Sequence, residues 1–93
     1  MKLVINCCYG GFSLSDEAYE LYCDLTGQKS GEVMLWDIRR DDPMLIHVVE
    51  KLGEKANDSF SKLKVVEIPD EVEWVLQEVD GAEWIAEKHR IWD

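Results

Sequence analysis

Apolar positions along this chain fall into short runs and helical stripes that predict alternating strands and helices. Lys2–Asn6 is a β-branched run typical of a buried strand. Glu32–Ile38 is nearly all apolar and predicts a second, central strand, and Leu63–Ile68 predicts a third. Between the runs, apolar residues recur with the period of a helix face, first at Ala18, Leu21, Tyr22 and Leu25 and then at Leu45, Val48, Val49, Leu52 and Ala56.

Capping residues mark the limits of both predicted helices. Ser13, with Asp16 three residues later, is a capping-box pattern that opens the first helix, and Gly27 is a natural C-cap. Asp42 before Pro43 places an N-cap ahead of a proline at the first helical position, where the missing N–H costs nothing. The first helix is therefore expected to end at Gly27, and the second is expected to begin after Asp42.

The last third of the chain predicts a β-hairpin. Val72, Trp74 and Leu76 alternate with polar residues, as in a half-exposed strand, and Asp80-Gly81 is a strong hairpin-turn signal. The return strand would run from about Ala82 to Lys88, within residues 82–90. That segment also contains good helix formers, so a closing helix is the structural alternative.

This order of elements predicts an α/β (α+β) fold in a single domain over residues 1–93. The expected architecture is a β-α-β-α-β core with a C-terminal β-hairpin, in which two helices pack on a small mixed sheet. Right-handed crossovers would make the first three strands parallel and place both helices on one face.

Composition and charge exclude several classes of function. The chain has 20 Asp+Glu against 10 Lys+Arg, a net charge of −10, but its 46% apolar residues are enough for it to fold. Generic nucleic-acid binding is not expected, because it requires a basic face. No apolar run approaches the roughly 20 residues of a membrane span, and no signal peptide is evident, so no membrane association is expected. Three cysteines do not make a disulfide framework, which fits a reducing cytosol.

If the first three strands are parallel, the turns that follow them meet at one edge of the sheet, where helix N-termini favour an anion. The Gly10-Gly11 turn would let the backbone approach a phosphate or carboxylate, and Arg39 and Arg40 would clamp it. Alternatively, the glycines form only a tight turn and the arginines pair with nearby carboxylates. The predicted ligand-binding residues are Cys8, Tyr9, Gly10, Gly11, Arg39, Arg40, His89 and Arg90.

Candidate catalytic and metal chemistry is sparse. Cys8 lies beside a predicted helix N-terminus, which would lower the pKa of a thiol. Of the two histidines, His89 is a better candidate than His47 for the base that a catalytic thiol needs. The alternative is that Cys8 is an ordinary buried cysteine. Cys7, Cys8 and Cys23 lack the spacing of a metal site. We therefore assign no catalytic residue and expect neither a metal nor a cofactor.

The negative charge is concentrated near the C-terminus. Residues 1–36 carry a net charge of −3, residues 37–64 are neutral and residues 65–93 carry −7. Acids interleaved with tryptophans suit binding to a basic protein. Alternatively, the tryptophans are core and the acids only a solubilising face. The predicted partner-binding residues are Glu71, Glu73, Trp74, Glu83, Trp84 and Glu87.

Three segments carry a resemblance to a known group of proteins. Residues 8–18 (CYGGFSLSDEA), 40–43 (RDDP) and 80–92 (DGAEWIAEKHRIW) resemble a family of small, uncharacterised proteins of tailed bacteriophages and prophages. The resemblance covers almost the whole chain. It implies a protein made in the cytoplasm of an infected bacterial host, but it implies no catalytic role because the family has no settled activity.

Two functions follow as expectations. The first is a non-enzymatic phage accessory protein that binds and blocks or sequesters a host or defence protein. The alternative is a small protein that binds a nucleotide-like anion at the carboxyl edge of the sheet, where catalysis is an open question. A homodimer is a further expectation.

Overall fold

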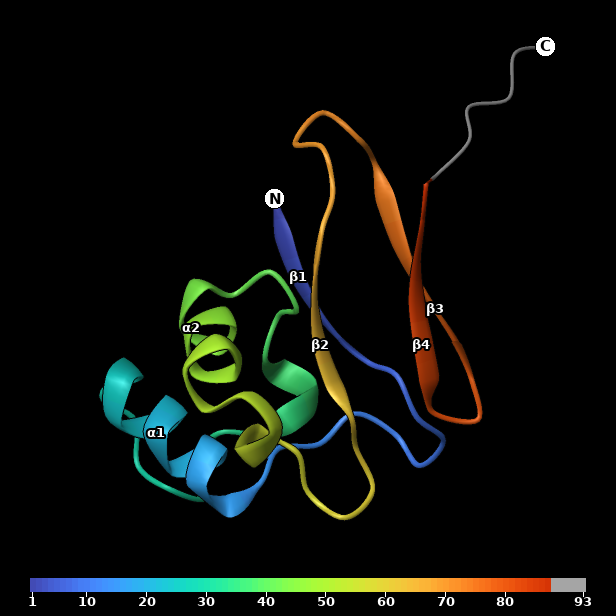
Figure 1. Cartoon of the computed structure of the whole chain (residues 1–93). Helices are drawn as coiled ribbons and strands as arrows, with labels where there is room; N and C mark the ends of the chain where they lie inside the picture. The colour runs from blue at the N-terminus through green and yellow to red at the C-terminus, as the bar shows by residue number, and fades with distance from the viewer. Residues whose placement is uncertain (88–93) are drawn as a thin grey trace, which may run out of the picture.

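Two helices and two small antiparallel sheets make up residues 1–87, the part of the chain that the computed structural model describes. Strand β1 pairs with β2, and β3 pairs with β4. Figure 1 shows the helices on one side of the β1–β2 pair and the β3–β4 hairpin on the other. The elements, in chain order, are β1 (Lys2–Asn6), α1 (Asp16–Thr26), the 3₁₀ turn η1 (Leu35–Asp37), α2 (Pro43–Leu52), the 3₁₀ turn η2 (Gly53–Ala56), β2 (Leu63–Glu67), β3 (Trp74–Val79) and β4 (Ala82–Glu87).

Both predicted helices are confirmed, with small shifts at their ends. The N-cap of α1 is Ser15 rather than Ser13, and its hydroxyl accepts from the backbone N–H of Ala18 at 3.1 Å. The helix ends at Gly27, whose φ of 70° is the predicted left-handed C-cap. Asp42 caps α2 as predicted, but the α-helix stops ahead of Gly53 and only a 3₁₀ turn continues to Ala56.

Strand β1 is covered on both faces. Val4 is fully buried in the core that β1 shares with α1 and α2. Leu3 and Ile5 point to the opposite face and are also buried, with exposed fractions of 0% and 5%. Because β1 contacts β4 as well as α2, this short strand joins the helical half of the molecule to the hairpin.

The predicted parallel β-α-β-α-β core is wrong, because residues 32–38 do not form a strand. A central strand would bury nearly every apolar side chain in this segment, but only Val33 and Ile38 are buried. Met34 is 43% exposed and Trp36 81% exposed, because the η1 turn directs them outward. Without a strand between the helices, β2 returns beside β1 in the antiparallel direction.

The backbone N–H groups on the free edge of β1 donate hydrogen bonds to groups outside the sheet instead. The N–H of Val4 donates to the carbonyl of Arg40 at 2.9 Å. The N–H of Asn6 donates to the Glu83 carboxylate at 2.8 Å. One carbonyl and one side chain therefore occupy the edge where the predicted central strand would have paired.

The predicted hairpin is confirmed over β3 and β4, and residues 82–87 form a strand rather than a helix. Residues 88–90 of that prediction lie outside the described residues. Asp80 and Gly81 have φ values of 52° and 91°, as the two central residues of a type I′ turn require. The turn packs against the loop after β1, where the N–H of Gly10 donates to the Asp80 carbonyl at 3.1 Å.

The contact between these two turns predicts that Gly81→Ala destabilises the fold strongly. A Cβ at Gly81 would overlap the backbone nitrogens of Gly10 and Gly11. Gly31 is a matched control, because its φ of 92° is within a degree of the 91° of Gly81 but a Cβ there meets nothing within 4 Å. We expect Gly31→Ala to cost about 1–2 kcal/mol of unfolding free energy and Gly81→Ala about 2 kcal/mol more, measured by urea denaturation. Equal losses would contradict the turn-to-turn contact.

A hydrogen bond between the helices predicts a loss of stability at alkaline pH. The Tyr22 hydroxyl donates to the Asp42 carboxylate at 2.7 Å. Burial, followed by this hydrogen bond, raises the pKa of Tyr22 to about 12. The folded state therefore holds the phenol proton more tightly than the unfolded state, whose tyrosine pKa is about 10. The stabilisation is complete below pH 10 and is lost as the pH rises towards 12.

Denaturant titrations of wild type and Tyr22→Phe between pH 8 and pH 12 test this expectation. The wild type should lose stability more steeply above pH 10 than the variant, and parallel curves would show that Tyr22 is not responsible.

Candidate functional site

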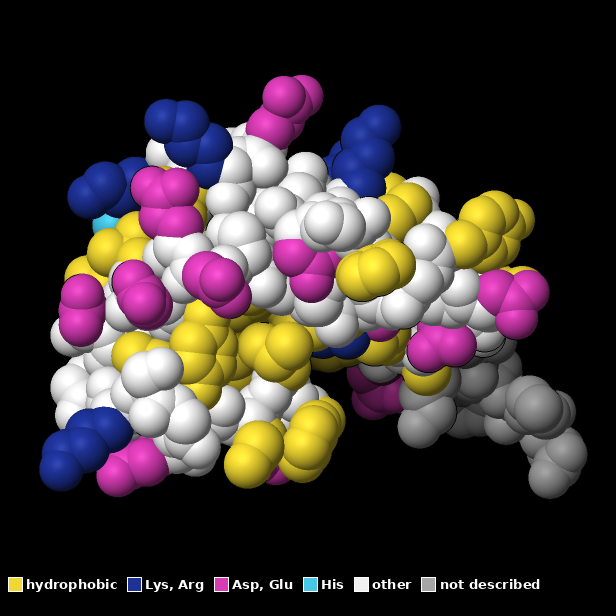
Figure 2. Space-filling view, turned by 90° about the horizontal axis from the view of Figure 1, so that it is seen from below, with side chains coloured by type: hydrophobic (Ala, Val, Ile, Leu, Met, Phe, Trp, Pro, Cys, Tyr) yellow, Lys and Arg dark blue, Asp and Glu magenta, His cyan; other side chains and the backbone are white. Residues whose placement is uncertain are grey.

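A groove lies between the segment around η1 and the β3–β4 hairpin. Its volume is about 740 Å³. Figure 2 shows hydrophobic side chains bordering a hollow between the two halves of the molecule. The lining residues are Phe12, Val33, Met34, Leu35, Trp36, Asp37, Ile38, Arg39, Arg40, Asp41, Trp74, Leu76, Glu78 and Glu83.

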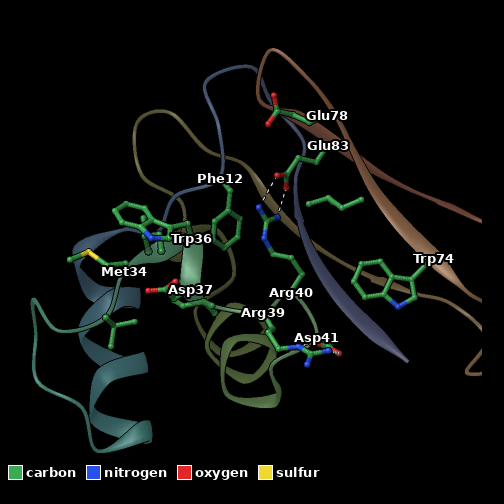
Figure 3. A pocket seen from close by; sticks show the side chains of 14 residues that line it. Phe12, Met34, Trp36, Asp37, Arg39, Arg40, Asp41, Trp74, Glu78 and Glu83 are labelled. Atoms are coloured by element: carbon green, nitrogen blue, oxygen red, sulfur yellow. Dashed lines mark hydrogen bonds and ion pairs between the residues drawn. The ribbon is translucent and has the colours of Figure 1, made fainter.

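Local structure determines which side chains reach the groove. On the hairpin side, strand alternation directs Trp74, Leu76 and Glu78 to the same face of β3. On the other side, the η1 turn presents Trp36 and Asp37. Figure 3 shows Trp36 and Trp74 on opposite sides of the Arg40–Glu83 pair.

The floor of the groove is a buried ion pair. Nη2 of Arg40 donates to Oε2 of Glu83 at 2.8 Å, and Nη1 donates to Oε1 of the same carboxylate. The Arg40 guanidinium also lies over the Phe12 ring, 3.7 Å from the centroid. The two side chains are only 17% and 4% exposed. With Asn6 donating to the same carboxylate, the pair ties the helical half, β1 and the hairpin together.

The ion pairs leave the groove with uncompensated negative charge. Its lining includes four carboxylates and two guanidiniums, a net charge of −2. Arg39 pairs with Asp41 at 3.0 and 3.1 Å, and Arg40 pairs with Glu83. Within residues 1–87, no ion pair involves Asp37 or Glu78. The groove therefore presents two carboxylates without an ion-pair partner in the described part of the chain, of which Glu78 accepts a hydrogen bond from the N–H of Gly81 at 3.4 Å.

The predicted anion site is not assembled as expected. Arg39 and Arg40 pair with carboxylates, which was the alternative interpretation of these residues. Cys8, Tyr9, Gly10 and Gly11 do not line the groove and form the loop that contacts the hairpin turn instead. The carbonyl of Cys8 accepts from the buried Asn6 amide at 2.7 Å, and Cys8 Sγ lies 3.3 Å from the Phe60 carbonyl. This loop has a structural role.

Asp70, in the loop after β2, accepts a hydrogen bond from the amino group of Met1, and this contact lowers the pKa of its carboxyl. His89 and Arg90 lie outside the described residues, so the predicted partnership of Cys8 with His89 has no structural description.

The predicted partner-binding residues lie on three different surfaces. Glu71, Glu73 and Glu87 are exposed, and Trp74 forms a wall of the groove. Trp84, 43% exposed, projects from the opposite face of the hairpin. Glu83 does not belong to the predicted acidic surface, because it is only 8% exposed and neutralises Arg40.

Sequence reasoning missed the η1 side of the groove. Met34, Trp36 and Asp37 were assigned to a central strand, which would have made them inaccessible. The available signal was the large Trp36 followed directly by Asp37, because a charged residue is costly inside a fully buried strand.

Two further structural findings concern the described residues alone. Among them, no three His, Cys, Asp or Glu side chains are grouped so that they could hold a metal ion. No helix in this part of the chain is long and apolar enough to cross a membrane.

A scan against models of protein families, a search of curated proteins and a search of solved structures each find no match to this chain. Functional inference therefore depends on the residues of the chain itself.

The buried pair at the floor predicts a large asymmetry between single and double substitutions. Glu83→Ala leaves the Arg40 charge buried without its partner and should cost about 3–5 kcal/mol of unfolding free energy. The double variant Arg40→Met/Glu83→Leu removes both charges and should recover at least half of that loss. Urea denaturation of the wild type and these variants provides the comparison.

Asp41→Ala is the control, because it breaks the pair with Arg39, which is 80% exposed. It should cost less than about 1 kcal/mol. A Glu83→Ala loss as small as that of Asp41→Ala would show that the buried pair does not hold the halves together.

Proposed function

We propose that this chain is a small, non-enzymatic phage accessory protein that binds a basic host or defence protein and blocks or sequesters it. The phage context depends on the resemblance of residues 8–18, 40–43 and 80–92, which implies a protein made in the cytoplasm of an infected bacterial host. The binding activity is supported by the described surface itself.

The observation that carries this proposal is the free negative charge on and beside the hairpin. Glu71, Glu73 and Glu87 are exposed, and none forms an ion pair within residues 1–87. The groove alongside adds two carboxylates that form no ion pair within the same residues, and the exposed indole of Trp36. Unpaired acids attract a basic partner over distance, and tryptophans supply the short-range contact area that holds it.

The anion-binding alternative has less support. An anion needs free donors, and the two guanidiniums that were expected to provide them are occupied by carboxylates. The net charge of −2 around the groove also repels a phosphate. The expected homodimer stays a prediction, and a symmetric contact through the hairpin would have to overcome the repulsion between two acidic surfaces.

Charge reversal on the hairpin tests the proposed function. The immobilised chain should capture a stoichiometric partner from bacterial lysate, and Glu71→Lys/Glu73→Lys should weaken capture at least about tenfold at physiological salt. The matched control is Glu20→Lys/Asp24→Lys, which changes net charge equally at exposed positions of α1. It should capture as the wild type does.

Equal loss of capture in both variants would show that the interaction is only non-specific charge attraction. Unchanged capture in the hairpin variant would remove the electrostatic argument.

A thermal-shift screen with nucleotides tests the alternative function, binding of a nucleotide-like anion. A nucleotide at 100 times its Kd would add about 2.7 kcal/mol of stability. Such a shift, abolished in Arg39→Ala, would reverse the ranking of the two functions.

A further inference from the structure

The groove has the same two kinds of group on each of its walls. Trp36 and Asp37 lie on the η1 side, and Trp74 and Glu78 lie on the hairpin side. Figure 3 shows the walls separated by the Arg40–Glu83 pair, which forms the floor between them. Each wall therefore combines one indole with one carboxylate that has no ion-pair partner among residues 1–87.

This combination favours a cation with a flat or apolar body. An indole face attracts a cation, most strongly where water is displaced, and a carboxylate completes the charge balance. A guanidinium meets both requirements at once, because it stacks on an aromatic ring and bonds a carboxylate through two N–H groups. An anion would be repelled by the net charge of −2.

The size of the groove also indicates a ligand that is larger than a single ion. Its volume of about 740 Å³ lies in the roughly 300–1,000 Å³ range of sites that enclose a drug-sized ligand. One arginine side chain would not fill it, whereas the side chain together with its neighbouring residues in an extended segment would. The apolar lining from Met34 and Leu76 suits such neighbours.

We propose that the groove receives an extended, basic segment of the partner, whose arginine side chain stacks on Trp36 and pairs with Asp37 while the rest of the segment crosses the floor towards Trp74 and Glu78. This assignment rests on the proposed function and specifies what the protein recognises. The floor pair takes no part in binding directly. It fixes the separation of the two walls, because Arg40 comes from the η1 side and Glu83 from the hairpin.

Titration with defined peptides tests this assignment. The probes are acetyl-Gly-Val-Arg-Val-Gly-amide and the same peptide with glutamate in place of arginine, followed through the indole N–H resonances of the ¹⁵N-labelled full chain. The arginine peptide should shift the Trp36 and Trp74 resonances and leave that of Trp84 unchanged. The glutamate peptide should bind at least about tenfold more weakly, since like charges replace opposite ones.

Two matched pairs of variants locate the interaction. Trp36→Ala should weaken arginine-peptide binding about fivefold, the size of a partly desolvated cation–π contact, whereas Trp84→Ala on the opposite face of the hairpin should change it less than about twofold. Trp36 is 81% exposed, so its removal should leave the fold intact. Glu78→Gln should weaken binding more than Glu71→Gln, which removes an equal charge outside the groove.

Several results would overturn the assignment. These are equal binding of the two peptides, no arginine-peptide shift at Trp36, or unchanged affinity in Trp36→Ala. Tighter binding of adenosine monophosphate, lost in Trp36→Ala, would also overturn it in favour of an anion site. If Glu71→Lys/Glu73→Lys abolishes partner capture while Trp36→Ala retains it, the groove assignment fails and the proposed function stands.

Discussion

The bidentate pair between Arg40 and Glu83 is the interaction on which the rest of this structure depends. Arg40 comes from the segment that precedes α2, and Glu83 comes from β4, 43 residues further along the chain. The same carboxylate accepts from the N–H of Asn6, so three separate parts of the chain meet at one side chain. Because most of the pair is shielded from water, its geometry is enforced by the cost of leaving either charge alone.

The pair also explains why a chain of this size can maintain an open groove. Small domains bury a smaller fraction of their surface on folding than large domains do, so few contacts are available to fix the relative position of two elements. Here the guanidinium and the Phe12 ring fill the space at the base, while η1 and β3 stand on either side.

Local features of the sequence predicted the elements well, but their arrangement depended on long-range contacts that no local pattern records. Asp42-Pro43, Gly27 and Asp80-Gly81 each specify a cap or turn through their own backbone preferences, and all three are confirmed. The segment around Trp36 was assigned wrongly, because a short apolar run has no period that separates a buried strand from an anchored turn. Because this segment is not a strand, the predicted parallel sheet does not form, and neither does the sheet edge at which the anion site was predicted.

In the proposed interaction the groove, rather than the acidic surface in general, recognises an arginine side chain. Intermolecular nuclear Overhauser effects between the ¹⁵N,¹³C-labelled chain and the unlabelled arginine peptide measure this most directly. We expect contacts from the arginine side-chain methylenes to the indole protons of Trp36, and from the flanking valine methyl groups to the indole protons of Trp74. Contacts to Trp84 and the outer face of the hairpin instead, with none to Trp36, would contradict it.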